Sequence, residues 1–410
     1  MRRCTERLRT DAMMIATFMT SGTPQKAPTV KPGYLPTLDG WRSIAILAVI
    51  FSHAYGFLQF GYTRLAHILH WPGVVYFLPK IGEKGVELFF GISGFLICSR
   101  LIEEQNACGH ISLKGFYIRR ASRILPPALN YLLFISILAL LGAIAENRMD
   151  ILSSVFFFRN YHSASDWYTG HFWSLAVEEH FYLLWPSTVA LLGLTRSRWA
   201  AIFGILAVVV WRGFHWQAMA TETRIHTDLR LDGLLMGCLT ALFAAELQKF
   251  LTRRSAVILP ALLLAIYIAV DQVSGPLVTV SKLIQATAVA LVIVATVFNP
   301  GWLFSRLMES APLKWIGRLS YSLYLWQQLF FYPSLNSHRF LLAQAGLRVG
   351  GAFVAAYLSY KFIEKPAIKW GHRHAPPVTP GRGDLTGEQV RGNTAQVAVA
   401  GTSQVGSTMP

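Results

Sequence analysis

The sequence predicts an all-α, polytopic membrane protein with about ten transmembrane helices. The 410-residue chain is 53% hydrophobic and only 14% charged, whereas a soluble domain of this size needs more charge on its surface. Apolar runs of about 20 residues, the length that crosses a bilayer as a helix, recur along the chain. They show no alternation at a period of two, so helices are favoured over a transmembrane barrel.

The net charge of the chain, +16, would also suit a nucleic-acid-binding protein. Membrane proteins, however, collect Lys and Arg in their cytoplasmic loops. We therefore expect the lipid bilayer as a partner and no nucleic acid. The four cysteines lack the spacing of metal ligands, so we expect free thiols: they are Cys4, Cys98, Cys108 and Cys238.

Three segments are expected along the chain. Residues 1–36 are predicted to form a flexible cytoplasmic segment without a signal peptide. Residues 37–366 form the transmembrane domain, and residues 367–410 form a disordered cytoplasmic tail. The expected spans of the domain are 38–59, 84–103, 124–145, 173–195, 198–214, 229–249, 255–271, 279–298, 315–334 and 341–363.

Positive charges between the spans indicate the orientation of the protein. If the N-terminus is cytoplasmic, the segments on that side hold clusters such as 119–123, 253–254 and 361–373, and the opposite loops hold fewer Lys and Arg residues. This bias predicts that both ends of the chain are cytoplasmic.

The first span carries Arg42 and His53, which are costly to place in lipid and are therefore candidates for function. They are eleven residues apart, close to three helical turns, so they share one stripe about 16 Å long. Asp39 falls near the same stripe. The orientation places Arg42 near the cytoplasm and His53 past the middle of the bilayer. Alternatively, His53 bonds a neighbouring helix and Arg42 reaches the headgroups.

Three arginines, Arg119, Arg120 and Arg123, gather where the third span begins. Anchoring at the cytoplasmic surface explains any one of them. Together with Arg42, at the same membrane level, they would also form a site for phosphate groups, because guanidinium groups bind phosphates with two parallel hydrogen bonds.

Glu178 and Glu179 lie in the fourth span, which enters the membrane from the opposite side, so they approach the depth of His53. A carboxylate beside a histidine is a common arrangement for general-base chemistry. The segment lacks the histidine pair of a zinc protease helix, so no metal site is expected. Ion pairs that only hold the helices together are the alternative.

Arg230 and Asp232 lie in the segment 227–237. Either of them could pair with a glutamate or line a substrate vestibule, and we give the two roles equal weight. Gly233 and Gly237 in the same segment allow two helices to cross closely. Later in the chain, segment 317–327 is typical of helix packing.

These segments, in this order, resemble the acyltransferase 3 family of integral-membrane acyltransferases over about residues 36–366. The family pattern of an arginine, ten intervening residues and a histidine falls on Arg42 and His53, and its Arg-x-x-Arg pattern falls on Arg120 and Arg123. Two longer patterns fall on Phe89–Phe95 and Trp173–Tyr182. Many members carry a histidine where this chain has Gln327, so no catalytic role is assigned there.

The resemblance implies transfer of an acyl group, often acetyl, from cytoplasmic acyl-CoA to a hydroxyl of a saccharide or glycolipid in a bacterial inner membrane, with acyl-CoA as co-substrate and no bound cofactor. His53 would act as general base or accept the acyl group transiently. The remaining candidates are Glu178 and Glu179 as catalytic residues, Arg42, Arg119, Arg120 and Arg123 as donor-binding residues, and Asp39, Tyr182, Arg230 and Asp232 as acceptor-binding or structural residues.

A transporter or flippase that relays protons through the same intramembrane charges is the alternative function. The missing internal repeat and the arginine cluster count against it.

Overall fold

The described part of the chain is built from helices. The computed structural model describes residues 34–68, 80–162, 167–251, 262, 265–266, 275–332 and 341–376. These residues contain no β-strand, so the all-α prediction is confirmed. Three parts of the chain lie outside the described residues. They are residues 1–33 of the expected N-terminal segment, residues 377–410 of the expected tail and nearly all of the expected span 255–271.

Each expected span within the described ranges coincides with one or more helices. In chain order the α-helices are α2 (Pro36–Ile68), α4 (Ile81–Cys108), α5 (Leu113–Leu140), α6 (Arg148–Val155), α7 (Trp167–Gly170), α8 (Phe172–Phe214), α9 (Thr227–Leu242), α10 (Ala244–Phe250), α12 (Val278–Phe298), α13 (Leu303–Met308), α14 (Ala311–Phe330), α15 (Leu341–Ser359) and α16 (Lys365–His374).

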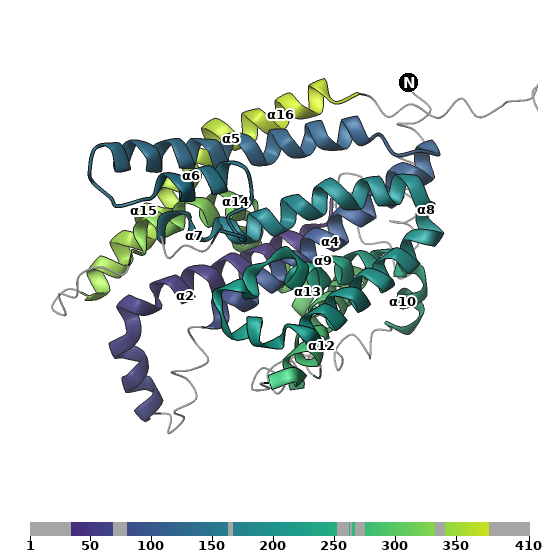
Figure 1. Cartoon of the computed structure of the whole chain (residues 1–410), viewed down its shortest axis with the longest axis horizontal. Coiled ribbons are helices and arrows are strands. Elements are labelled where there is room, and N and C mark those ends of the chain that lie inside the picture. Colours follow the sequence, from purple (N-terminus) through teal and green to yellow (C-terminus); the bar gives the residue numbers. More distant parts are fainter. Residues whose placement is uncertain are drawn as a thin grey trace, which may run out of the picture.

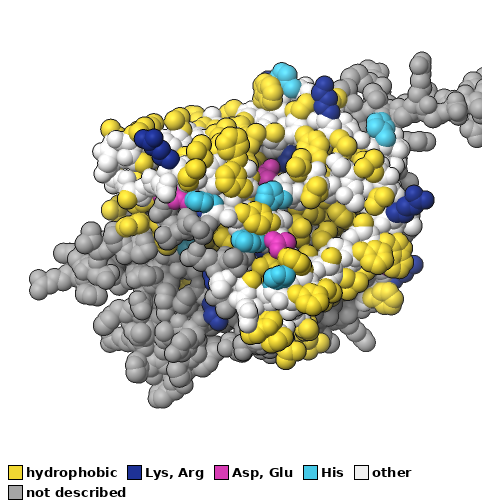
Figure 2. All heavy atoms as spheres, viewed as in Figure 1, with side chains coloured by type: hydrophobic (Ala, Val, Ile, Leu, Met, Phe, Trp, Pro, Cys, Tyr) yellow, Lys and Arg dark blue, Asp and Glu magenta, His cyan; other side chains and the backbone are white. Residues whose placement is uncertain are grey.

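Several of these helices are long and apolar enough to cross a membrane. Among the described residues, Ile81–Cys108, Leu113–Leu140, Trp167–Phe214 and Gly275–Phe298 meet this description, and the pair α9 and α10, bent by 77°, would add a fifth. Hydrophobic side chains cover much of the face in Figure 2, and Leu140, Leu191 and Phe214 are each at least 80% exposed. Such a surface suits lipid rather than water. The chain is a multi-pass membrane protein.

Helix α8 consists of two runs that meet at Gly193. This residue has φ 73°, a left-handed conformation that glycine adopts without steric cost. Figure 1 shows the chain reversing its direction there. The two runs correspond to the separately expected spans 173–195 and 198–214.

The helices that form the centre of the molecule are α2, α4, α9 and α14. Figure 1 shows α5 beside α16 along one edge, α2, α4 and α9 through the middle, and α12 at the opposite edge. The hydroxyl of Tyr321 in α14 donates to the carbonyl of Ile124 in α5 at 2.8 Å. Because this hydroxyl bonds a carbonyl inside the membrane domain, it fixes α14 against α5 without leaving a buried polar group unpaired.

The last helix extends past the expected domain end at residue 366. Helix α15 passes through one wider turn, Tyr360–Glu364, into α16, which continues to His374. Pro366 lies at the expected domain end, but it does not end the helix. It occupies the first turn of α16, where its missing N–H has no helical partner to lose. Residues 367–374 are therefore helical.

Glycines bring α4 and α9 into close contact, as we expected for Gly233 and Gly237. A Cβ atom at Gly237 would overlap the backbone of Gly91, and one at Gly94 would overlap the backbone of Leu234. Small residues of this kind let two helix backbones approach each other within a membrane.

We predict that Gly237→Leu destabilises the protein by about 1–3 kcal/mol or prevents it from folding, because the backbones of α4 and α9 must separate. The measurement is the thermal denaturation midpoint of the purified protein in detergent. Gly213→Ala is the control, since a Cβ atom there meets nothing within 4 Å. If both variants denature at the temperature of the parent protein, the packing described for α4 and α9 is wrong.

Candidate active site

A polar cavity lies between α2, α4, α5, α8 and α14 and contains about 650 Å³ of empty space. We call it the arginine cavity, because Arg42, Arg120 and Arg123 line it. Its other polar side chains are Ser93, Ser174, Glu178, Ser320, Tyr321 and Tyr324. Cations that are costly in lipid therefore gather around a space that a ligand can enter.

The arginines of this cavity differ in their partners. Arg42 donates to Asp39 at 3.1 Å, and the same carboxylate accepts the hydroxyl of Tyr34 at 2.6 Å. The guanidinium of Arg120 lies 3.8 Å from the centre of the Tyr182 ring. Neither Arg120 nor Arg123 forms an ion pair with a described residue. Glu178 and Glu179 still act on the charge of Arg120, and Glu364 acts on that of Arg123. Because no carboxylate of the described residues is within ion-pair distance, an anionic ligand can bind either guanidinium directly.

Arg119 does not line the arginine cavity, although the sequence grouped it with the other arginines. Its Nη2 atom lies 3.2 Å from Glu104 at the end of α4. Glu104 also accepts the backbone N–H of Ser112 at 2.7 Å, where α5 begins. Successive residues of a helix are separated by about 100°, so Arg119 and Arg120 face different directions. Arg119 connects α4 to α5 instead.

Glu178 has partners of its own on the wall of the cavity. It accepts the hydroxyl of Tyr182 at 2.6 Å and the hydroxyl of Ser93 at 3.1 Å. Ser93 belongs to the segment Phe89–Phe95 that the sequence singled out. Glu179 does not line the cavity, and it has no hydrogen bond or ion pair to a described side chain.

His53 pairs with Gln327 of α14 and not with a glutamate. The Nδ1 atom of His53 lies 2.8 Å from Oε1 of Gln327. The amide nitrogen of Gln327 donates to Gln328 Oε1 at 3.0 Å, which turns its oxygen toward the histidine. An oxygen can only accept, so Nδ1 carries the proton and Nε2 keeps a lone pair. Among the described residues, His53 makes no hydrogen bond or ion pair with Glu178 or Glu179, which were its expected neighbours.

Tyr324 lies between His53 and the arginine cavity. Its ring lines the cavity, its hydroxyl donates to the carbonyl of His171 at 2.9 Å, and its carbonyl accepts from Gln327 at 3.4 Å. Phe89 packs edge-on against the same ring, with centres 6.2 Å apart. His53 thus lies beyond the Tyr324 end of the cavity, about 16 Å from Arg42 along α2 at 1.5 Å per residue.

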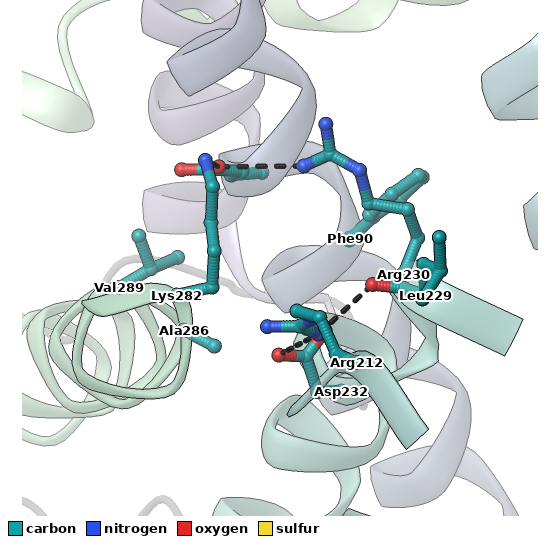
Figure 3. Close-up of a pocket in the computed structure, with 10 residues that line it drawn as sticks. Phe90, Arg212, Leu229, Arg230, Asp232, Lys282, Ala286 and Val289 are labelled. Carbon is teal, nitrogen blue, oxygen red and sulfur yellow. Dashed lines mark hydrogen bonds and ion pairs between the residues drawn. The ribbon is translucent and has the colours of Figure 1, made fainter. Parts of the chain in front are cut away.

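Arg230 and Asp232 lie outside the arginine cavity, in a second group of charges between α4, α8, α9 and α12 (Figure 3). The sequence did not single out their partners. Arg230 pairs with Glu83 at 2.5 Å, and Asp232 pairs with Arg212 at 2.6 Å. A charge within an apolar span was the available signal for these partners, but it does not say which charges meet.

Comparison with known proteins identifies the family. The model of a family described as an acyltransferase domain matches residues 35–360. The chain belongs to this acyltransferase family. The match covers the helices that line the arginine cavity as well as His53 and Gln327.

The relatives of this acyltransferase include named O-acetyltransferases. It is 28% identical over 376 residues to the peptidoglycan O-acetyltransferase of Listeria monocytogenes, covering 82% of this chain and 56% of that one. It is 27% identical over 382 residues to a candidate peptidoglycan O-acetyltransferase of Bacillus subtilis, covering 83% and 56%. A candidate O-acetyltransferase of Staphylococcus aureus is 29% identical over 388 residues, covering 83% and 58%. The chain spans about half the length of these relatives. No solved structure matches it.

We predict that Gln327→Leu slows acyl transfer by about 10- to 100-fold, as loss of a supporting hydrogen bond does at other sites, because the His53 ring is no longer oriented. Gln327→Glu keeps an oxygen opposite Nδ1 and should retain much more activity. The measurement is the initial rate of acyl transfer in membranes with equal amounts of each variant. Equal rates for the parent and Gln327→Leu would contradict the orienting role.

Proposed function

We propose that this acyltransferase moves an acetyl group from cytoplasmic acyl-CoA to a hydroxyl group of a saccharide or glycolipid. The observation that carries the proposal is the arginine cavity. Arg120 and Arg123 have no ion-pair partner there among the described residues, and the cavity is lined by Tyr324, one helical turn from Gln327, which contacts His53. The names of the relatives support acetyl as the acyl group and a cell-wall saccharide as the acceptor class.

The donor would bind with its phosphates near Arg42, Arg120 and Arg123. Phosphate oxygens suit guanidinium groups, because each group offers several N–H donors in one plane. The acyl arm would then extend along the cavity past Tyr324 toward His53. Asp39 would hold Arg42 in position through their 3.1 Å contact.

His53 would perform the chemistry through Nε2, the nitrogen that Gln327 leaves without a proton. In one mechanism Nε2 accepts the proton of the acceptor hydroxyl, whose oxygen forms a bond to the thioester carbon as the carbon–sulfur bond breaks. The sulfur of coenzyme A then takes up a proton. In the other mechanism Nε2 attacks the thioester carbon, and the carbon–sulfur bond breaks to release the coenzyme A thiolate. The hydroxyl oxygen then attacks the same carbon as its bond to Nε2 breaks, and the hydroxyl proton is taken up by the thiolate. Both mechanisms require that Nε2 carries no proton, so that its lone pair is free.

Glu178, Tyr182 and Glu179 would serve this site less directly than the sequence suggested. Glu178 holds the hydroxyls of Tyr182 and Ser93, and the Tyr182 ring supports Arg120. We propose that Glu178 and Tyr182 position the donor-binding arginine, and that Glu179 adds negative charge near it.

The proposed topology has ten spans with both termini in the cytoplasm of a bacterial cell, in its inner membrane. In this topology nine spans would be formed by α2, α4, α5, the two runs of α8, α9 with α10, α12, α14 and α15, and residues 255–271 would supply the tenth. This topology supports the proposal, because Arg42, Arg120 and Arg123 then open toward the compartment that contains acyl-CoA.

We predict that His53→Ala lowers acyl transfer by about 10²- to 10⁴-fold, the range for loss of a general acid or base. Binding of acetyl-CoA should stay within a factor of about three, since His53 is remote from the arginines. The rate is measured with labelled acetyl-CoA in membranes, and binding is measured on the purified protein. Substantial transfer by His53→Ala would contradict the mechanism. Solute transport without acyl-CoA consumption would favour the transporter.

We predict that Arg120→Ala and Arg123→Ala each raise the KM for acetyl-CoA about 10- to 100-fold, which corresponds to one charge-assisted hydrogen bond. Arg119→Ala is the matched control from the same helix, and it should leave the KM nearly unchanged because Arg119 pairs with Glu104 outside the cavity. A KM that rises equally in all three variants would indicate a general effect of surface charge and not the proposed phosphate site.

A further inference from the structure

A second cavity lies between α4, α8, α9 and α12 and contains about 390 Å³ of empty space. We call it the Arg212 cavity. Figure 3 shows its charged side chains converging from these helices on one space. The charged residues are Glu87, Arg212, Arg230, Asp232 and Lys282, and the aromatic residue Phe90 also lines the cavity. Such a concentration of charge within apolar helices indicates a site that does more than pack.

Two cations of this cavity are held firmly by carboxylates. Arg230 lies 2.5 Å from Glu83 and 3.6 Å from Glu87. Lys282 lies 3.3 Å and 2.7 Å from the same two residues. Pairing of this kind offsets the cost of removing each ion from water. It also fixes the positions of Arg230 and Lys282 in the cavity wall.

Arg212 is different, because only part of its guanidinium has partners. Its side chain is 1% exposed. The Nη2 atom donates to the carbonyl of Leu229 at 2.9 Å and lies 2.6 Å from Asp232. The Nε and Nη1 atoms have no hydrogen-bond partner among the described residues. Buried donors without a partner are rare and costly, so an acceptor atom that entered the cavity would find two N–H donors there.

The charges around the cavity also favour an anion. The cations are Lys84, Arg212, Arg230 and Lys282, and the carboxylates are Glu83, Glu87 and Asp232. With four cations and three carboxylates, the described group carries one positive charge in excess. An anionic group bound at Arg212 would neutralise this charge and provide acceptors for its free N–H groups.

The Arg212 cavity and the arginine cavity share one wall. Phe90 lines both of them. The ring of Trp173 meets that of Phe90 with centres 6.1 Å apart, and the guanidinium of Arg230 lies 5.6 Å from the centre of the Trp173 ring. A molecule in the Arg212 cavity would therefore lie beside the proposed donor, separated by Phe90.

We propose that the Arg212 cavity binds an oxyanion carried by the acceptor saccharide, so that the acceptor of this chain is acidic. The oxyanion is either a carboxylate of the sugar or the diphosphate of a lipid-linked sugar. This inference rests on the proposed transfer to a saccharide. It assigns Arg212, Arg230 and Lys282 to acceptor recognition, as the arginine cavity is assigned to the donor.

The test compares the binding of three probes to the purified full-length protein. The first is the disaccharide of N-acetylglucosamine and N-acetylmuramic acid, which carries a carboxylate. The second is chitobiose, which is neutral, and the third is a short prenyl-diphosphate-linked N-acetylglucosamine. We expect at least one acidic probe to bind about 10- to 100-fold more tightly than chitobiose, the effect of one charge-assisted contact. The tighter acidic probe identifies the source of the oxyanion.

Two variants connect this preference to the cavity. The double variant Arg212→Gln with Asp232→Asn removes the cation without leaving Asp232 unpaired, and it should abolish the preference for the acidic probe. The single variant Asp232→Asn should keep this preference. If the double variant does not fold, Ala286→Glu provides a second test. Ala286 lines the cavity, so a carboxylate there should occupy Arg212 and exclude the probe, while thermal stability stays equal or rises.

Equal affinity for all three probes would overturn this inference. So would a preference that survives in the double variant Arg212→Gln with Asp232→Asn or in Ala286→Glu. The same preparations are assayed for binding of acetyl-CoA. Failure to bind acetyl-CoA, with the acidic preference intact, would overturn the proposed function and leave the acceptor site standing. Acetyl-CoA binding without any acidic preference would overturn the acceptor site alone.

Discussion

Helices α2 and α14 lie so close together that a side chain at Gly317 would overlap the backbone of Asp39. Asp39 near the start of α2 lies against Gly317 of α14, and His53 later in α2 contacts Gln327 later in α14. Residue numbers therefore rise together along both helices, so the two helices run in the same direction. This packing holds the Arg42 end and the His53 end of α2 at fixed levels beside α14. The arginine cavity depends on it, because Tyr324 of α14 forms the wall between those two ends.

The cost of a charge inside a membrane explains which charges are structural and which are candidates for ligand binding. Most charged side chains in the described spans are paired, as Arg119 is with Glu104 and as Arg198 is with Glu246. Removing one member of such a pair leaves a buried charge uncompensated, so the pairs hold helices together. Arg120 and Arg123 lack such partners, and each lines a cavity. The same reasoning separates Arg119, which Glu104 neutralises, from its neighbours.

Much of the fold could be predicted from the sequence, because hydrophobic span length and helical periodicity are local properties. The placement of Arg120 and Arg123 on one face followed from their spacing. The partner of His53 did not, since it depends on how far α14 is rotated and shifted against α2. Gln327 was given no role because many members of the family carry a histidine there, yet it lies 2.8 Å from His53. For the same reason Lys282 and Glu83, which are about 200 residues apart, could not be paired from the sequence.

The central claim is that acyl-CoA lies in the arginine cavity with its acyl group toward His53. Photocrosslinking with two acetyl-CoA analogues tests this claim directly, one reactive at the acyl end and the other at the adenine. The account predicts that the acyl-end label attaches to Phe89, Tyr324 or the α14 segment near Gln327. The adenine label should attach near the beginning of α2 or α5. The reverse pattern, or labelling of α9 and α12 by the acyl end, would contradict it.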